Sequence, residues 1–256
     1  MKIARVRTGL ATVPLRTPYA LSFVTLEAFP VRLVECTTDT GAAGFGEAVA
    51  LPGYGEETDE DVARALRHLA STIVGLEAEA AIDRVSRDET VGPFARSAVI
   101  SAIEDVIEPA AMNGPVEWPQ VGILSAGDPA ACVKKAASLE GFTTIKVKVG
   151  RDLETDTASA RALLRDGPPV RYRFDANQAY TEDEAARFLD VLGDHPAVEL
   201  VEQPLGIDEW AAFERLAVRA GVPLMLDESI LDETDIDRAA SVGADLIKLK
   251  LCKARG

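Results

Sequence analysis

The segment Thr144-Ile-Lys-Val-Lys-Val-Gly150 has the pattern of a β-strand that ends at a glycine. Its β-branched and apolar residues alternate with Lys146 and Lys148. Alternate side chains on a strand point to the same face, so both ammonium groups are expected on one face of the sheet. A strand at a solvated edge can carry the same pattern, and the interpretation therefore depends on the segments that follow.

Three later apolar runs each end in a carboxylate, and a fourth run carries another lysine. They are RYRFDANQAY with Asp175, VELVEQPL with Glu202, PLMLDESI with Asp227 and ADLIKLKLCK with Lys250. Counted from Lys148, these residues follow at intervals of 27, 27, 25 and 23. One strand, one helix and two short loops take about this length in successive βα units. In a parallel (β/α) barrel, active sites are built at the C-terminal ends of the strands.

The whole region from about residue 121 alternates between predicted strands and helices. The expected strands are 121–124, 144–149, 170–175, 198–202, 223–227 and 245–251, with helices at 128–139, 152–165, 181–192, 207–219 and 232–241. Such alternation predicts a parallel sheet with right-handed crossovers. A TIM-type barrel has eight βα units and usually needs about 250 residues. We therefore expect an α/β fold whose barrel is incomplete after the sixth strand, in a fragment or an incomplete sequence.

The N-terminal part has a different pattern, with strands first and helices afterwards. Expected strands are 2–15, ending at Pro14, then 31–38 and 42–49, with an irregular stretch at 20–29. Helices are expected from Thr58, which with Asp61 forms a capping-box pattern, and at 77–88 and 93–108. The sequence thus predicts an α+β domain over residues 1–115 and a barrel domain over residues 116–256.

Composition and charge argue against several kinds of partner and location for this protein. The 256-residue chain has a formal net charge of −15, which argues against nucleic acid or an anionic membrane as a partner. Its three cysteines are scattered and lack metal-ligand spacing, as expected of buried or inert thiols in a reducing compartment. The first fifteen residues lack the apolar core of a signal peptide, and no run is long enough to span a membrane. A cytoplasmic location is expected.

The residue types at the predicted rim point to a particular chemistry. Three clustered carboxylates, Asp175, Glu202 and Asp227, repel one another unless a cation neutralises them. A ligand set of hard oxygens without His or Cys suits Mg²⁺. Lys148 and Lys250 flank the carboxylates in strand order, and nearby positive charge makes a lysine easier to deprotonate. A neutral lysine facing a metal-bound carboxylate can remove the proton from the adjacent carbon.

These motifs together resemble the enolase superfamily. The resemblance rests on Lys146-Val-Lys148, Asp175-Ala-Asn177, Glu202-Gln-Pro204, Asp227-Glu-Ser229 and the segment 247–256, IKLKLCKARG, together with Gly44-Phe-Gly-Glu-Ala48 near the N-terminus. They are most similar to the muconate-lactonizing subgroup, which includes muconate cycloisomerases, dipeptide epimerases, N-succinylamino acid racemases and o-succinylbenzoate synthases. The resemblance covers nearly the whole chain.

What the resemblance implies can be assigned to individual residues. Asp175, Glu202 and Asp227 would bind Mg²⁺, Lys148 and Lys250 would be acid/base residues on opposite faces of a small carboxylate substrate, and Lys146 would support Lys148. The N-terminal domain would be a capping domain, whose loops at 16–28 and 50–57 close over the substrate. Asn177 and Glu228 would be outer residues that do not bind the metal. The resemblance also implies a homo-oligomer.

Some features depart from the family pattern or stay open. The usual Gly-Gly after the sixth-strand lysines is Arg255-Gly256 here, and the seventh and eighth strands are absent. Strand alternation places Lys248 on the same face as Lys250, so the choice of Lys250 rests on the family motif alone. A single carboxylate after a strand is more often a helix N-cap or a solvated charge. Three at this spacing, between two lysine-bearing strands, favour the metal site.

The reaction itself is left open among three readings. Racemisation or epimerisation would need both lysines as acid/base groups, one on each face of the substrate, and cycloisomerisation belongs to the same reading. Dehydration to o-succinylbenzoate would need one lysine as base. A non-catalytic metal-binding fragment is the remaining alternative, and the identity of the substrate cannot be obtained from these residues.

Overall fold

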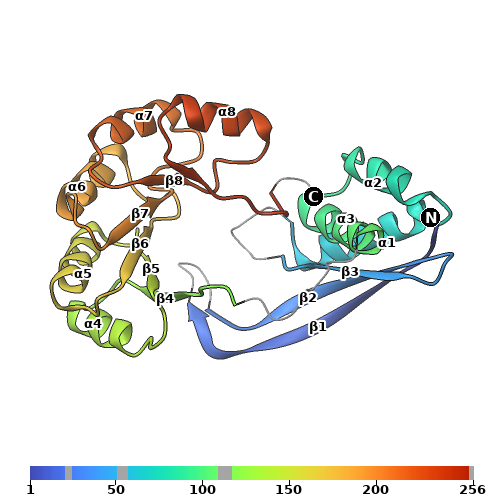
Figure 1. Cartoon of the computed structure of the whole chain (residues 1–256), viewed down its shortest axis with the longest axis horizontal. Coiled ribbons are helices and arrows are strands. Elements are labelled where there is room, and N and C mark those ends of the chain that lie inside the picture. The colour runs from blue at the N-terminus through green and yellow to red at the C-terminus, as the bar shows by residue number, and fades with distance from the viewer. Residues whose placement is uncertain (21–24, 51–56, 109–116, 254–256) are drawn as a thin grey trace. The chain divides into compact units, whose positions relative to one another are not determined.

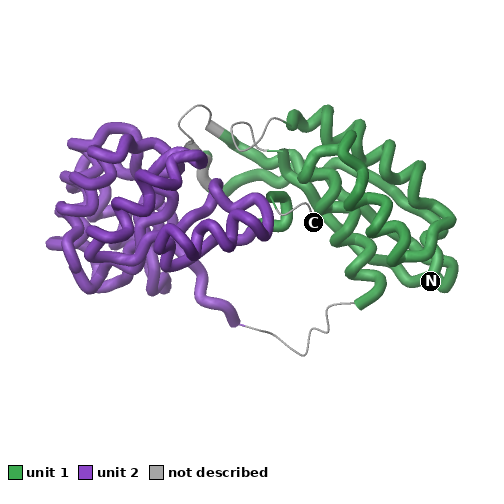
Figure 2. The backbone as a smooth tube through the Cα atoms, turned by 90° about the horizontal axis from the view of Figure 1, so that it is seen from above, with its two compact units in different colours: residues 1–115, 250–256 green, residues 116–249 purple. Residues whose placement is uncertain are grey.

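The computed structural model describes residues 1–20, 25–50, 57–108 and 117–253, and it divides into two compact units (Figure 2). One unit contains Met1–Pro115 with Lys250–Gly256, and the other contains Val116–Leu249. Each has a hydrophobic core of its own. The domain limits expected from the sequence, 1–115 and 116–256, remain a prediction.

An antiparallel sheet forms the first part of the N-terminal unit (Figure 1). Its order is β1 (Ile3–Ala20), β2 (Thr25–Thr38) and β3 (Ala43–Ala48). The β2–β3 hairpin turns at Gly41, whose φ of +86° is a conformation that favours glycine. The strands expected at 31–38 and 42–49 therefore pair as a hairpin.

Three helices follow the sheet: α1 (Asp59–Ile73), α2 (Ala78–Ser86) and α3 (Pro93–Ile107). The predicted capping box of Thr58 and Asp61 opens α1, and its apolar stripe is buried. Helix α3 lies directly on β3. The two backbones are so close that a Cβ on Gly44 would come within 2.3 Å of the Ala102 carbonyl oxygen. Glycine in this strand thus permits close contact between helix and sheet backbones.

Two expectations for the N-terminal strands were wrong. The first strand does not end at Pro14 but continues to Ala20, with Pro14 paired to Ala28. Proline is tolerated there because β1 is an edge strand and needs no second hydrogen-bonding partner. The stretch 20–29 is not wholly irregular, since β2 begins at Thr25 and pairs with β1 along this length. Residues 21–24 lie outside the described part of the chain.

A buried acid in the N-terminal unit leads to a pH prediction. Asp88 accepts hydrogen bonds from the Thr90 hydroxyl (2.5 Å) and backbone N–H (3.1 Å), and its other oxygen lies 3.0 Å from His68 Nε2. These contacts, the Thr90 hydroxyl first, lower the pKa of Asp88 to about 2 against the opposing effect of burial. A lowered pKa in the folded state stabilises the fold above the ordinary Asp pKa, and this contribution is lost as the pH falls towards 2.

We therefore expect Asp88→Asn to lower the free energy of unfolding by about 2 kcal/mol near neutral pH. The difference from wild type should shrink as the pH falls from about 5 to about 2, because Asp88 itself becomes neutral in that range. Urea unfolding at a series of pH values measures it. A difference that does not change over this range would contradict the assignment.

The second unit is an α/β fold built on a parallel sheet of six strands in sequence order. Figure 1 shows the helices along the outer side of the curved sheet. The strands are β4 (Val121–Ser125), β5 (Thr144–Lys148), β6 (Arg171–Asp175), β7 (Val198–Glu202), β8 (Leu224–Leu226) and β9 (Leu246–Ile247). The helices are α4 (Pro129–Ala137), α5 (Leu153–Asp166), α6 (Glu182–Leu192), α7 (Trp210–Arg219) and α8 (Glu233–Ser241). All eleven predicted elements exist; the last strand is shorter than predicted.

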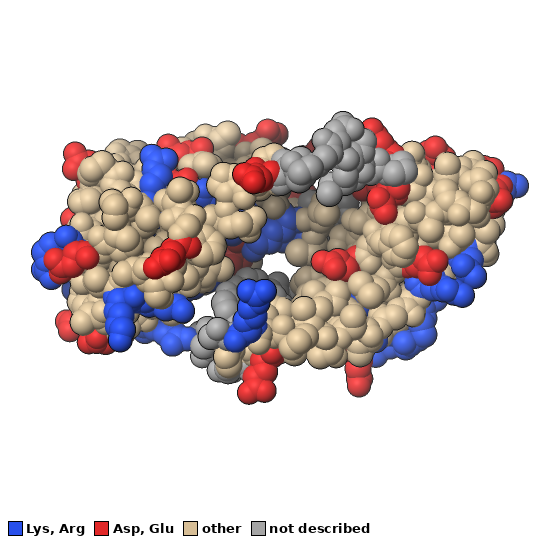
Figure 3. Space-filling model, turned by 60° about the horizontal axis from the view of Figure 1, so that its bottom comes forward, with Lys and Arg blue, Asp and Glu red and all other residues tan. Residues whose placement is uncertain are grey.

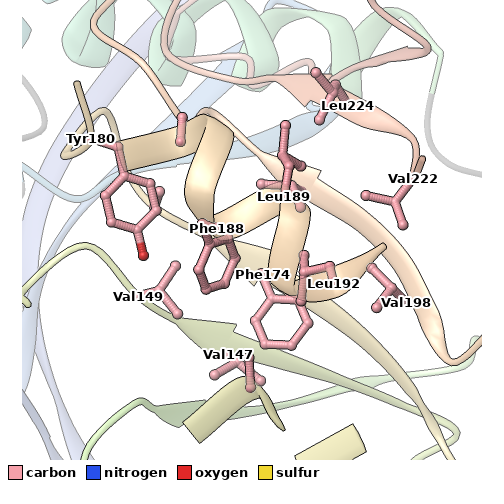
Figure 4. Packing of buried hydrophobic residues seen from close by; sticks show 14 of the residues in the cluster. Val147, Val149, Phe174, Tyr180, Phe188, Leu189, Leu192, Val198, Val222 and Leu224 are labelled. Carbon is pink, nitrogen blue, oxygen red and sulfur yellow. The ribbon is translucent and has the colours of Figure 1, made fainter. Parts of the chain in front are cut away.

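The alternation along the strands separates an apolar core from a polar face. Val147 and Phe174 point to the helix side, where Phe174 packs edge-on against Phe188 of α6 with ring centroids 5.5 Å apart (Figure 4). The neighbours of these residues in sequence, including Lys148 and Asp175, therefore lie on the opposite face of the sheet. The polar face and the ends of its strands form the candidate site.

Candidate active site

The residues expected at the rim come together through the strand register. Lys148, the last residue of β5, pairs with Asp175, the last residue of β6, and Asp175 pairs with Glu202, the last residue of β7. Asp227 follows β8 directly. The C-terminal ends of four neighbouring parallel strands thus carry one lysine and three carboxylates.

Ammonium groups lie between these carboxylates. Lys146 Nζ is 2.6 Å from Asp175 Oδ2 and 2.7 Å from Glu202 Oε2. Lys248 Nζ is 2.7 Å from Glu202 Oε1 and 3.6 Å from Asp227 Oδ2. Carboxylates and ammonium groups therefore alternate across the ends of β6, β7 and β8.

Lys148 is bound at one side of this arrangement. Its Nζ donates to Asp175 Oδ2 at 2.6 Å and to Asn177 Oδ1 at 2.5 Å. Lys146 contacts the same Oδ2 atom of Asp175, so the two ammonium groups share one carboxylate oxygen. Both ammonium groups therefore lie on one face of β5, and the supporting role of Lys146 towards Lys148 remains a prediction.

The carboxylates are almost completely buried, at 0 % exposure for Asp175 and 1 % for Glu202 and Asp227. Buried charges need close partners of opposite sign. Burial alone would raise the pKa of Asp175, but Lys146 and Lys148 outweigh it and the pKa is lowered. Conversely, burial opposes the charge of Lys146, yet Asp175 and Glu202 raise its pKa. Both partners are charged at neutral pH.

The loops beyond the strands hold these side chains in place. Gly150 has a φ of +98°, and a Cβ there would lie 2.7 Å from the Ala176 carbonyl oxygen in the loop after β6. The buried Asp156 accepts the Gly150 N–H at 2.7 Å and the Tyr180 hydroxyl at 2.8 Å through one oxygen. The chain after Lys148 is thereby fastened to the chain after Asp175.

Asn177 and Glu228 form an outer pair. Asn177 Nδ2 donates to Glu228 Oε1 at 2.9 Å, and Asn177 also accepts from Lys148. Glu228 Oε2 is buried and has no hydrogen-bond partner among the described residues. Burial, together with the neighbouring Asp227, raises the pKa of Glu228.

The donor set fits a hard divalent cation. Within the described residues, no three His, Cys, Asp or Glu side chains converge in the geometry of a metal site. Lys146 and Lys248 instead act as stand-in cations, each between two carboxylates of the set Asp175, Glu202 and Asp227. All the candidate ligands are carboxylate oxygens, the type that Mg²⁺ prefers. These three residues would hold it.

Two lysines, Lys248 and Lys250, follow the last strand, β9. The family motif favours Lys250 as the acid/base residue, and the structure places Lys248 against Glu202 and Asp227. Strand alternation alone allows either lysine. Lys250 belongs to the first compact unit, and its role as an acid/base residue remains a prediction.

The surface of the molecule carries charged side chains of both signs (Figure 3). Acidic and basic side chains are interspersed over the face shown in Figure 3. Among the described residues, none of the helices has both the length and the apolar character that crossing a bilayer demands. The predicted capping loops at 16–28 and 50–57 lie in part outside the described residues, namely at 21–24 and 51–56.

Comparison with known proteins agrees with the fold. Residues 3–116 match the mandelate racemase / muconate lactonizing enzyme N-terminal domain, and residues 129–256 match the enolase C-terminal domain-like family. The chain therefore belongs to the enolase superfamily, in the muconate-lactonizing subgroup, and is an enzyme of that superfamily.

Individual relatives show how far the similarity extends. The chain is 30% identical to the L-Ala-D/L-Glu epimerase of Bacillus subtilis and 28% identical to the N-succinyl-L-Arg/Lys racemase of Bacillus cereus, with all of this chain covered and 75% and 74% of theirs. It is 28% identical to muconate cycloisomerase 1 of Acinetobacter baylyi, covering 98% of this chain and 74% of that one. The substrate-liganded structure of the Bacillus subtilis epimerase has a TM-score of 0.87 at 29% identity, over 100% of this chain and 76% of that one. The structure of the Enterococcus faecalis dipeptide epimerase with Mg and L-Leu-L-Tyr has a TM-score of 0.88 at 26% identity, over the same shares.

Proposed function

We propose that the chain is a Mg²⁺-dependent racemase or epimerase that removes the proton α to the carboxylate of an N-acylated amino acid or a dipeptide. The observation that carries the proposal is the row of buried carboxylates, Asp175, Glu202 and Asp227, with lysine ammonium groups against them. Similarity to a racemase and to dipeptide epimerases supports the choice of substrate class. The second unit would then belong to a TIM-type barrel and the first would be its capping domain.

The lysines can be assigned different tasks from their contacts. Lys146 is held by two carboxylates and its pKa is raised, so it remains an ammonium ion at neutral pH. Lys148 lies at the end of its strand and donates both to the carboxylate of Asp175 and to the neutral amide of Asn177, and it is the better candidate to exchange a proton with substrate. Mg²⁺, when bound to the three carboxylates, would supply positive charge that favours loss of the proton on the substrate's α-carbon.

Reversal of configuration needs a second acid/base group on the opposite face of the substrate. Lys250 is proposed for this task on the family motif. Lys248 sits against Glu202 and Asp227 and would balance their charge while no divalent cation is bound. The homo-oligomeric state expected from the family remains a prediction.

Proton NMR in D₂O tests the proposal. The chain is incubated with Mg²⁺ and a panel of N-succinyl amino acids and L,L-dipeptides, and loss of the α-proton signal is followed. We expect exchange with at least one member and loss of exchange when EDTA is added. cis,cis-Muconate belongs in the same panel, because its conversion without exchange of any amino acid α-proton would favour cycloisomerisation. A chain that binds Mg²⁺ but exchanges none of these substrates would contradict the proposal.

A further inference from the structure

Gln203 occupies a central position between the ends of β7 and β8. It follows Glu202 directly, and its side chain is buried, with 1 % exposure. Its amide can neither supply a charge nor exchange a proton at neutral pH, so the side chain is neither an acid nor a base. A buried polar side chain next to a proposed metal ligand nevertheless needs partners for all its polar atoms.

The amide of Gln203 makes four hydrogen bonds. Its Nε2 donates to the Leu205 carbonyl oxygen at 2.9 Å and to the Ser229 hydroxyl at 2.7 Å. Its Oε1 accepts the backbone N–H of Asp227 at 2.9 Å and that of Ser229 at 3.2 Å. A primary amide has two N–H donors and two acceptor lone pairs, so its whole capacity is used.

The backbone of Gln203 links the same region to two other strands. Its N–H donates to the Met225 carbonyl oxygen in β8 at 2.8 Å, and its carbonyl oxygen accepts the N–H of Gln178, beyond β6, at 2.8 Å. Its φ of +38° is unusual for a residue other than glycine. Backbone strain of this kind persists only where the surroundings hold it, and it often occurs at functional sites.

We propose that Gln203 is a positioning residue that sets Asp227 against Glu202, so that both carboxylates can bind the same divalent cation. The inference rests on the proposed function. Its basis is direct: Gln203 is covalently joined to Glu202 and holds the N–H of Asp227 through its own side chain. The amide acts on the metal by fixing the spacing of two ligands, without touching the cation.

Two substitutions of similar size separate this role from simple space filling. Gln203→Glu keeps the shape but removes both N–H donors and places another negative charge beside Glu202 and Asp227. Gln203→Met keeps most of the volume and leaves the N–H groups of Asp227 and Ser229 without their acceptor. In Gln203→Met, Asp227 should shift, since an unpaired buried N–H group is costly and the loop will move to satisfy it. In Gln203→Glu the acceptor of the Asp227 N–H is kept, but a carboxylate oxygen would face the Leu205 carbonyl oxygen, and their repulsion should displace the side chain and Asp227 with it.

The matched control is Ser159→Ala in the same unit. The Ser159 side chain is fully buried and makes two hydrogen bonds to Gly127, in the loop after β4, at 2.7 Å and 3.2 Å. The substitution therefore also removes buried hydrogen bonds to a loop at a strand end, but at a strand that carries no proposed ligand.

Titration with Mn²⁺, followed by the electron paramagnetic resonance signal of the free ion, measures the result without relying on activity. For both Gln203 variants we expect the Kd for Mn²⁺ to rise by about 10- to 100-fold, the effect typical of groups that orient metal ligands. The Kd of Ser159→Ala for Mn²⁺ should stay within about twofold of the wild-type value. The melting temperature of this variant should fall, because it loses buried hydrogen bonds. If neither Gln203 variant folds, Ser229→Ala, which removes one of the four partners, should still raise the Kd severalfold.

Each contrary result has a distinct meaning. Folded Gln203 variants that bind Mn²⁺ as tightly as wild type would overturn the positioning role alone. An equal loss of affinity in Ser159→Ala would also overturn it, because general destabilisation would then explain the effect. A wild-type chain that binds no Mn²⁺ would overturn the proposed metal site itself, and with it this inference.

Discussion

Replacing Lys148 by alanine is expected to lower the Mg²⁺-dependent rate of α-proton exchange by about a thousandfold, within the range usual for loss of a general base. The reason is positional: Lys148 lies at the end of β5, next to Asp175, and its second partner is the neutral amide of Asn177. Proton NMR in D₂O measures the rate with the best substrate from the panel.

The Lys148→Ala variant should still bind the divalent cation. Lys148 donates to Asp175, a proposed ligand, so removal of its charge should leave the affinity for Mn²⁺ unchanged or slightly tighter. Lys134→Ala, at an exposed position on α4, is the control and should exchange at the wild-type rate. Exchange in the Lys148 variant within about tenfold of wild type would exclude Lys148 as the principal base.

Replacing Glu202 by glutamine is expected to weaken Mn²⁺ binding by at least about 100-fold. Glu202 is the central carboxylate, placed between Asp175 and Asp227, and Lys146 and Lys248 both contact it. Glutamine retains the shape and a hydrogen-bond acceptor but loses the negative charge that a hard cation requires. Calorimetric or spectroscopic titration gives the affinity.

A matched control lies on the same strand. Glu199 lies three residues before Glu202 on β7. It accepts a hydrogen bond from Arg173 at 2.8 Å and is not a proposed ligand. Glu199→Gln should change the Kd for Mn²⁺ by no more than about twofold, since it removes the same charge farther from the site. Equal losses in the two variants would show that net charge, and not ligation, controls the binding of the ion.

The sequence contained enough information for the βα units because two physical signals coincide there. Apolar residues such as Val147 and Phe174 recur at the period of two that a strand imposes, and the lysines and carboxylates fall between them. The parallel register then follows from chain connectivity, and it places Lys148, Asp175 and Glu202 on neighbouring strand ends. The grouping of these charged residues could therefore be predicted.

Other features depend on contacts that no local pattern reveals. Pro14 looks like the end of a strand unless β1 is known to be an edge strand. The contacts of Lys248 depend on how the short β9 strand meets β8. The four hydrogen bonds of Gln203 join residues up to 26 positions apart and involve backbone N–H groups, which every sequence contains. Tertiary structure was needed to find them.

A crystal of the chain soaked in Mn²⁺ gives the most direct test of the metal centre, because anomalous scattering locates the ion itself. We predict a single peak within coordinating distance of Asp175, Glu202 and Asp227, with Lys146 and Lys248 moved away from at least one of their carboxylate partners. A map with no peak among these three side chains, or with the ion bound at another set of residues, would contradict the account.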